Sequence, residues 1–263
     1  MSITVRDVRA FKERGERFVM LTAYDYPTAR ILDEAGVPVL LVGDSVADNI
    51  LGYETTVPVT MEEMLHHTRA VARGAKDALV VGDLPFMSYQ TSLEDGIRNA
   101  GRFLKEGGAH AVKFEGPMIE LASALVDRGI PVMGHLGLTP QSVHAMGGYR
   151  VQGRNEEDAR QLFDAAGALS KAGAFSLVLE GIPADLARDI TEAVPVPTIG
   201  IGAGPHCDAQ VLVISDLLGY GLRKPAKFVK AYADLHGEIT RAVTAFKDEV
   251  VAGTFPDDEH SYH

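Results

Sequence analysis

The sequence predicts a closed (β/α)₈ barrel of the TIM type, and three observations support this prediction. Strand-like and helix-like segments alternate along the chain, and eight short apolar runs are typical of strands. These runs are continuously apolar, which favours parallel strands that are buried on both faces. The length of 263 residues also suits such a barrel, which usually needs roughly 250 residues. Because no linker or shift in composition interrupts the chain, we expect one domain that covers residues 1–263.

The predicted elements follow in a regular order, beginning with a short N-terminal helix. Thr4 can cap this helix, which runs through Phe11 and ends near Gly15. The predicted strands cover residues 18–22, begin at residues 39, 79 and 111, and cover residues 131–135, 177–180, 197–201 and 211–214. The predicted helices cover residues 27–35, 60–73, 93–106, 118–127 and 156–171. Thr60 and Glu63 form a capping-box signature at the start of the second of these helices.

An extra helix is predicted near the C-terminus. Apolar residues recur there at helical spacing, namely Phe228, Tyr232, Leu235, Ile239, Val243, Phe246 and Val250. They would share one face of the helix and pack on the barrel or on a partner subunit. The polar tail at residues 256–263 is expected to be a loop.

Composition narrows the class of protein. The formal net charge is -11, which argues against binding to nucleic acid or to an anionic membrane. No apolar stretch approaches membrane-spanning length, and residues 1–17 offer no signal-peptide core. The single cysteine, Cys207, excludes an intrachain disulfide and fits a reducing compartment. We therefore expect a soluble, cytoplasmic protein.

Four acidic residues stand at the ends of predicted strands: Asp44, Asp83, Glu115 and Glu180. In α/β barrels this end of the strands carries the active site. Buried carboxylates are costly unless they are paired, hydrogen-bonded or bound to a metal, so their convergence suggests a cation. A set of oxygen ligands favours Mg²⁺. For each aspartate alone, an N-cap or turn role stays open.

Lys113 and Glu115 lie two apart on one predicted strand, so they point to the same side. Val112 and Phe114 then face the covering helices. A strand-end salt bridge is one interpretation of the lysine. Together with the two aspartates, however, a lysine inside the barrel mouth predicts an anionic substrate.

Glu180 ends an apolar run that contains no cationic neighbour in sequence. Apolar surroundings raise the pKa of a carboxyl group, and a carboxylate tuned in this way suits removal of a proton from carbon. A strand-end residue hydrogen-bonded to a loop is the alternative. For His135, contact with substrate and a purely structural role both stay open. Gly43 and Gly82, which precede the two aspartates, are expected to allow close approach of a ligand.

Several motifs, in order over nearly the whole chain, resemble the ketopantoate hydroxymethyltransferase family. They are LTAYD at residues 21–25, LVGDS at 41–45, DLPFM at 83–87, VKFEG at 112–116, GHLGLTPQS at 134–142, GGYRVQG at 147–153 and IGIGAG at 199–204. The resemblance implies a (β/α)₈ barrel that forms a homo-oligomer, a decamer in bacterial members. It implies transfer of a hydroxymethyl group from 5,10-methylenetetrahydrofolate to 3-methyl-2-oxobutanoate, which forms ketopantoate and tetrahydrofolate in pantothenate biosynthesis.

The resemblance also assigns roles to residues. It implies that Mg²⁺ is held by Asp44, Asp83 and Glu115, that substrate contacts Asp44, Ser45, Asp83 and Lys113, and that Glu180 is the base. Supporting roles are expected for His135, Tyr24 and Asp25. In the expected reaction Glu180 removes the proton from C3 of the oxo acid, and the metal with Lys113 stabilises the enolate that attacks the folate carbon. Pterin pockets have no short motif, so no residues are predicted for the folate site.

Two other functions stay open at this stage. One is a Mg²⁺ barrel enzyme of the isocitrate lyase and phosphoenolpyruvate mutase type. The lyases of that type use a cysteine in a mobile loop, whereas Cys207 follows the seventh predicted strand without such a motif. The other is a non-catalytic barrel that binds a metal and keto-acid complex. The presence of a base, metal ligands and a lysine argues against it.

Overall fold

The computed structural model describes residues 2–222 and 224–263. The chain divides after Val213 into two compact units. The expectation of a single domain over residues 1–263 stays a prediction.

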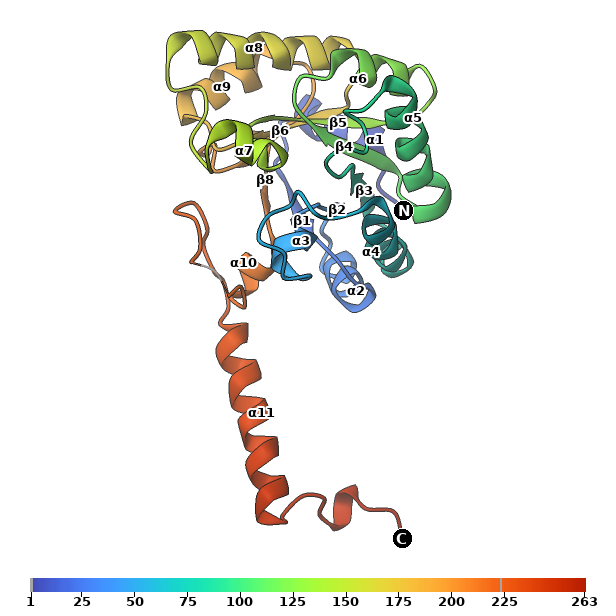
Figure 1. Ribbon diagram of the computed structural model, residues 1–263, viewed down its shortest axis with the longest axis vertical. Coiled ribbons are helices and arrows are strands. Elements are labelled where there is room, and N and C mark those ends of the chain that lie inside the picture. The colour runs from blue at the N-terminus through green and yellow to red at the C-terminus, as the bar shows by residue number, and fades with distance from the viewer. Residues whose placement is uncertain (1, 223) are drawn as a thin grey trace. The chain divides into compact units, whose positions relative to one another are not determined.

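The first unit is a closed barrel of parallel strands in the sequence order β1-β2-β3-β4-β5-β6-β7-β8, as Figure 1 shows. The strands are β1 Phe18–Thr22, β2 Val39–Val42, β3 Leu79–Asp83, β4 Ala111–Glu115, β5 Val132–Gly137, β6 Ser176–Glu180, β7 Thr198–Ile201 and β8 Ala209–Leu212. The predicted fold class is therefore confirmed. The last strand was predicted two residues too late, because its apolar run continues into the next helix, which starts at Ile214.

Helices surround this barrel and close its ends. They are α1 Val5–Glu13, α2 Tyr26–Glu34, α3 Val46–Asn49, α4 Met61–Gly74, α5 Leu93–Arg102, α6 Ile119–Val126, α7 Val143–Met146, α8 Glu156–Lys171 and α9 Ala184–Ala193. A π-helical turn, η1 Phe103–Gly107, extends α5, and a 3-10 turn, η2 Pro140–Ser142, follows β5. Thr4 and Thr60 form capping boxes with Asp7 and Glu63, which fixes the starts of α1 and α4.

The interior of the barrel changes from apolar to polar along the strands. Near their amino ends, the core contains Met20, Val39, Leu79, Ala111, Met133, Ile199 and Ala209. Two and four residues after Ala111, the same inward side of β4 carries Lys113 and Glu115, both almost completely buried. The alternation of the strand therefore places charged groups only at the carboxyl end, where the chemistry of a barrel belongs.

The N-terminal helix closes the opposite end of the barrel. The rings of Phe11 and Phe18 stack with their centroids 5.1 Å apart. Nζ of Lys12 donates to the carbonyl oxygen of Thr191 at 2.6 Å and to Oδ2 of Asp208 at 3.0 Å. Oδ2 of Asp208 also accepts a hydrogen bond from the backbone N–H of Thr198 at 2.8 Å. These hydrogen bonds join α1 to the last turn of α9 and to the segment between β7 and β8.

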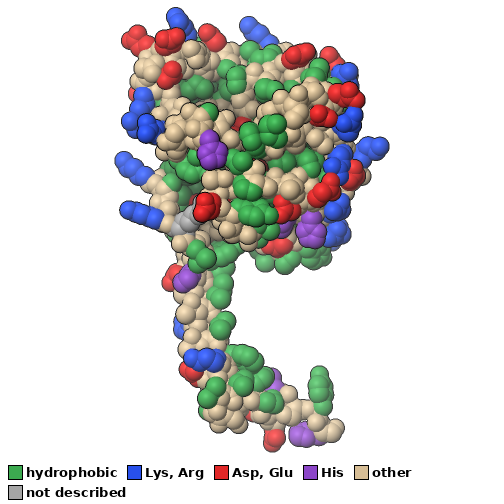
Figure 2. Space-filling model, in the orientation of Figure 1, with side chains coloured by type: hydrophobic (Ala, Val, Ile, Leu, Met, Phe, Trp, Pro, Cys, Tyr) green, Lys and Arg blue, Asp and Glu red, His purple; other side chains and the backbone are tan. Residues whose placement is uncertain are grey.

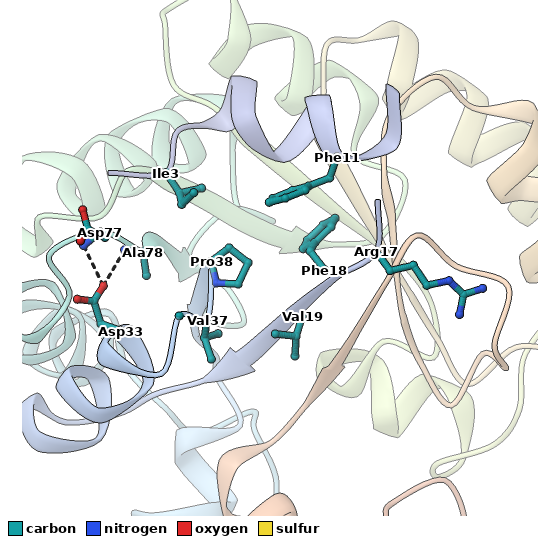
Figure 3. A pocket seen from close by; sticks show the side chains of 11 residues that line it. Ile3, Phe11, Arg17, Phe18, Val19, Asp33, Val37, Pro38, Asp77 and Ala78 are labelled. Atoms are coloured by element: carbon teal, nitrogen blue, oxygen red, sulfur yellow. Dashed lines mark hydrogen bonds between the residues drawn. The ribbon is translucent and has the colours of Figure 1, made fainter. Parts of the chain in front are cut away.

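A cavity of about 650 Å³ lies at this closed end, shown in Figure 3. Phe11 and Phe18 face each other in it, and Oδ1 of Asp33 accepts hydrogen bonds from the backbone N–H groups of Asp77 at 2.9 Å and Ala78 at 2.7 Å. None of the four strand-end acids lines it. The cavity is therefore separate from the predicted site.

The second unit contains α10 Ile214–Leu218, α11 Leu235–Ala252 and η3 Asp258–His260. The extra C-terminal helix is confirmed, but its predicted start was wrong. Asp234 accepts a hydrogen bond from the backbone N–H of Gly237 and caps the helix there, so Phe228 and Tyr232 precede it. The tail predicted as a loop contains the η3 turn, which Asp257 caps.

α11 buries none of its side chains. The side chains of its apolar face are between 47% and 61% exposed, with Ile239 at 48%, Val243 at 61%, Phe246 at 56% and Val250 at 47%. Figure 2 shows hydrophobic side chains along this helix. Across the described ranges of the chain, no helix is both long and apolar enough to cross a membrane.

Candidate active site

The predicted residues come together in a cavity of about 100 Å³ at the carboxyl ends of the strands. The four strand-end acids, Lys113, Ser45 and His135 all line it. Its remaining wall is formed by Thr22, Leu41, Thr56, Pro140, Val178, Ile201, Val211 and Val213. The barrel thus gathers side chains that are distant in sequence around one small space.

Asp83 and Lys113 form an ion pair inside this space. The register of β3 and β4 sets the two residues side by side, and Nζ of Lys113 lies 2.7 Å from Oδ2 of Asp83. The same oxygen accepts a longer hydrogen bond, 3.3 Å, from the backbone N–H of Asp44. Burial opposes the charge on Lys113, but the carboxylates around it raise its pKa, so it stays a cation. Burial raises the pKa of Asp83 against the opposing effect of Lys113.

Glu115 and Asp44 are held by one residue, Gln141. The backbone N–H of Gln141 donates to Oε2 of Glu115 at 3.0 Å, and its side-chain Nε2 donates to Oδ2 of Asp44 at 2.9 Å. Burial raises the pKa of Glu115 well above its usual value, and the charge of Asp44 adds to that shift. Gln141 was not predicted to have a role; its only signal was its place in the GHLGLTPQS motif.

His135 lies between two of the carboxyl groups. Its Nε2 is 3.2 Å from Oε2 of Glu180, and its Nδ1 is 3.7 Å from Oε1 of Glu115. Burial lowers the pKa of His135 well below its usual value, and the charge of Lys113 acts in the same direction, so the imidazole is neutral. Burial raises the pKa of Glu180 to about 7, with Lys113 opposing the rise. The pKa of Glu180 is therefore raised, as expected, although charged and polar side chains share its cavity.

Of the two remaining predicted residues, Tyr24 contacts a residue of the cavity and Asp25 does not. The hydroxyl of Tyr24 lies 2.8 Å from Oγ of Ser45, so Tyr24 supports the residue that follows Asp44. The carbonyl oxygen of Tyr24 lies 2.7 Å from Nδ1 of His67. The structure does not bring Asp25 to the cavity. Asp25 is exposed and accepts a hydrogen bond from the backbone N–H of Thr28 as the N-cap of α2.

Gly82 was expected to allow close approach of a ligand, and this expectation was wrong. A Cβ atom at Gly82 would meet the ring of Phe103 at 2.3 Å, on the side where helices cover the barrel. Gly82 therefore makes room for helix packing rather than for a ligand, and alanine at this position would not be harmless. At Gly43, the nearest atom to such a Cβ is Oγ of Ser45 at 2.8 Å.

The charges and free oxygens of the site fit a small divalent cation. Four carboxyl groups face one ammonium group and one neutral imidazole. Oδ1 of Asp83 and Oε1 of Glu115 are buried and have no hydrogen-bond partner, which is costly unless a ligand uses them. Carboxylate oxygens suit Mg²⁺. Among the described residues, no group of three or more histidine, cysteine, aspartate or glutamate side chains is arranged to hold a metal ion. Substrate and water oxygens would have to complete the coordination.

The fold and this cavity define a (β/α)₈-barrel protein with an acid–base cluster at the carboxyl ends of its strands. A family model described as ketopantoate hydroxymethyltransferase matches residues 2–258. The chain belongs to this family, which confirms the resemblance seen in the motifs.

Two relatives agree with this assignment over most of their length. A 3-methyl-2-oxobutanoate hydroxymethyltransferase of Thermobifida fusca (strain YX) is 59% identical over 262 residues, which cover 99% of this chain and 93% of the relative. A protein of the same name from Moorella thermoacetica (strain ATCC 39073 / JCM 9320) is 58% identical, with 99% and 97% covered.

Solved structures share the barrel at much lower identity. A phosphoenolpyruvate phosphomutase from Streptomyces platensis subsp. rosaceus has a TM-score of 0.63 and 14% identity, covering 99% of this chain and 92% of that one. A 2,3-dimethylmalate lyase, described as a PEP mutase/isocitrate lyase superfamily member, has a TM-score of 0.63 and 17% identity, with 99% and 89% covered. These likenesses concern the fold alone.

Proposed function

We propose that this chain transfers a hydroxymethyl group from 5,10-methylenetetrahydrofolate, with water, to 3-methyl-2-oxobutanoate, forming ketopantoate and tetrahydrofolate in pantothenate biosynthesis. Membership of the ketopantoate hydroxymethyltransferase family supports the proposal, since relatives that are 58% and 59% identical carry the name of this activity. The chemistry begins with removal of a proton from C3 of the oxo acid, which needs a base inside the cavity.

The observation that carries the proposal is the position of Glu180. Its side chain is 17% exposed, it lines the cavity, and its pKa is raised to about 7. Such a carboxylate is partly deprotonated near neutral pH and is a stronger base than an exposed one. The neutral His135 lies 3.2 Å from Glu180 and places no positive charge beside it.

Lys113 would bind the anionic substrate and stabilise the negative charge that develops on it during the reaction. Its ammonium group stays protonated, and it is held by Asp83 at the floor of the cavity. A preorganised cation of this kind stabilises a developing oxyanion most effectively in a buried site. Ser45, held by the hydroxyl of Tyr24, offers a further hydrogen-bonding group to the substrate.

Mg²⁺ held by Asp44, Asp83 and Glu115 would, when bound, polarise the 2-oxo group and acidify the neighbouring C–H. The unpartnered oxygens of Asp83 and Glu115 support these two ligands. The cavity of about 100 Å³ suits a small oxo acid, so the far larger folate would approach from outside its mouth.

We also propose that the protein is a homo-oligomer, with the decamer of bacterial family members as its expected size. The apolar face of α11 supports association, because Ile239, Val243, Phe246 and Val250 together expose a continuous hydrophobic stripe.

The direct test of the activity is a product assay. Purified protein, the oxo acid, Mg²⁺ and 5,10-methylenetetrahydrofolate should yield tetrahydrofolate and ketopantoate in equal amounts. A lyase or mutase of the same fold would convert its own substrate without tetrahydrofolate, and a binding protein would give no product. Either result would contradict the proposal.

A further inference from the structure

Gln141 is the most highly connected polar side chain at the mouth of the barrel. It is almost completely buried and lies in η2, after β5. Its Nε2 donates to Oδ2 of Asp44 and to the carbonyl oxygen of Leu84, both at 2.9 Å. Its Oε1 accepts from the hydroxyl of Tyr89 at 2.7 Å and from Nε2 of Gln90 at 3.2 Å. All four hydrogen-bonding positions of the amide are therefore used.

Gln141 also contacts the carboxylate of Glu115, through its backbone N–H group. Its N–H donates to Oε2 of Glu115 at 3.0 Å, and this leaves Oε1 of Glu115 as the oxygen without a partner. Tyr89 completes the arrangement, because its hydroxyl also accepts from the backbone N–H of Glu115 at 3.1 Å. Gln141 thus joins the ends of β2, β3 and β4 to the turn after β5.

We propose that Gln141 is a positioning residue that, with the Tyr89 hydroxyl, holds the carboxylates of Asp44 and Glu115 in place for a divalent cation. This inference rests on the proposed function, in which these carboxylates bind Mg²⁺. Gln141 itself does not line the cavity.

The chemistry of the amide explains why glutamine is needed. Two N–H groups must face two acceptors, the Asp44 carboxylate and the Leu84 carbonyl, while the amide oxygen must face two donors. The hydroxyl of Tyr89 fixes which end of the amide points to Asp44. Without Gln141, Asp44 would lose the donor that fixes one of its oxygens, and its side chain could turn toward Lys113. Residues that orient metal ligands in this way typically change metal affinity by roughly 10-fold to 100-fold.

The test is Mg²⁺ binding to metal-free protein, measured by calorimetric titration without substrate. Gln141→Met keeps the length of the side chain but removes its hydrogen bonds. We expect it to weaken Mg²⁺ binding by roughly 10-fold to 100-fold and to raise the KM for the oxo acid, with the KM for the folate unchanged. Gln161→Met, an exposed glutamine on α8, is the matched control and should bind as wild type does.

Tyr89→Phe is a milder second variant that serves if Gln141→Met folds poorly. It removes one hydroxyl and keeps the ring against Phe114, and we expect roughly 2-fold to 10-fold weaker Mg²⁺ binding. The double variant should weaken Mg²⁺ binding by less than the product of the two single effects, because both changes break the hydrogen bond between Tyr89 and Gln141, while Tyr89 also contacts the backbone of Glu115.

Circular dichroism and the Tm of each variant separate positioning from folding. If both variants bound Mg²⁺ within about twofold of wild type, as typical surface substitutions do, the positioning role would be wrong whatever their activity. If the wild-type protein bound no Mg²⁺, the proposed function would fail first, and the role of Gln141 with it.

Discussion

Nε2 of His135 lies 3.2 Å from Oε2 of Glu180, and the two side chains share the buried mouth of the barrel. Burial favours the uncharged form of both groups, because it lowers the pKa of the imidazole and raises the pKa of the carboxyl group. A neutral histidine therefore accompanies a carboxyl group whose pKa is about 7. Burial is what raises the pKa of Glu180, and the proposed role of Glu180 as the base rests on this raised pKa.

The first prediction concerns the pH dependence of proton exchange at C3 of 3-methyl-2-oxobutanoate. Only the deprotonated form of Glu180 can act as the base, so the rate should rise with pH through about 7 and level off above it. The measurement is the loss of the C3 proton signal in deuterated buffer, from roughly pH 5 to roughly pH 9. A rate that is flat across neutral pH would exclude Glu180 as the titrating base.

The second prediction concerns stability. The pKa of Glu180 is about 7 in the folded state against an ordinary value of 4.5, so ionisation of this group opposes folding. The free-energy cost of ionising Glu180 in the folded state is absent below pH 4.5. It is complete above about pH 7, where it lowers the free energy of unfolding by roughly 3 kcal/mol. In metal-free buffer Glu180→Gln should therefore be more stable than wild type at about pH 8, with the gap falling below about 1 kcal/mol at pH 5.

Urea unfolding at the two pH values measures this gap. Glu192→Gln, which changes an exposed carboxyl group on α9, is the matched control and should show no such gap. Equal stability of Glu180→Gln and wild type at about pH 8 would mean that Glu180 is not destabilised by ionisation.

The third prediction concerns the buried ion pair of Asp83 and Lys113. Lys113→Met leaves the Asp83 carboxyl buried without its cation, which typically costs about 3–5 kcal/mol. Adding Asp83→Asn removes the unpaired charge, so the double variant should be more stable than Lys113→Met alone. Urea unfolding of the wild type, Lys113→Met, Asp83→Asn and the double variant gives the four free energies of this double-mutant cycle. Arg98→Met breaks an exposed pair with Glu94 and should change little. A double variant less stable than Lys113→Met would show that the two residues are not coupled as described.

The fourth prediction concerns assembly through α11. Val243 is 61% exposed in the middle of the apolar face, so Val243→Lys should shift the protein toward smaller species. Thr244→Lys adds the same charge on another side of the helix and should leave the mass unchanged. Light scattering after size-exclusion chromatography gives the masses. Identical masses for wild type and Val243→Lys would exclude this face as the interface.

The strand-end residues could be predicted from the sequence because a parallel barrel brings every strand end to one rim. Recognition of four apolar runs was enough to find the strand-end acids Asp44, Asp83, Glu115 and Glu180. The spacing of Lys113 and Glu115 showed that these two side chains point to the same side of their strand. These inferences depend on periodicity, which is a local property of the chain.

What was missed depends on contacts between distant parts of the chain. Gln141 has no chemical signature of its own, and its role follows from its contacts with Asp44 and Tyr89. Gly82 was interpreted from its neighbour Asp83, although the ring of Phe103 determines why it must be glycine. The start of α11 was placed too early because an apolar period continues into the preceding loop, where the Asp234 cap outweighs it.

The central claim is that Glu180 removes the C3 proton of the oxo acid. The most direct measurement is deuterium exchange at C3 of 3-methyl-2-oxobutanoate, catalysed by Glu180→Gln in the presence of Mg²⁺ and without folate. Glutamine has nearly the same shape and cannot accept the proton, so exchange should fall by roughly 100-fold or more while the oxo acid still binds. Exchange as fast as that of the wild-type protein would contradict the assignment.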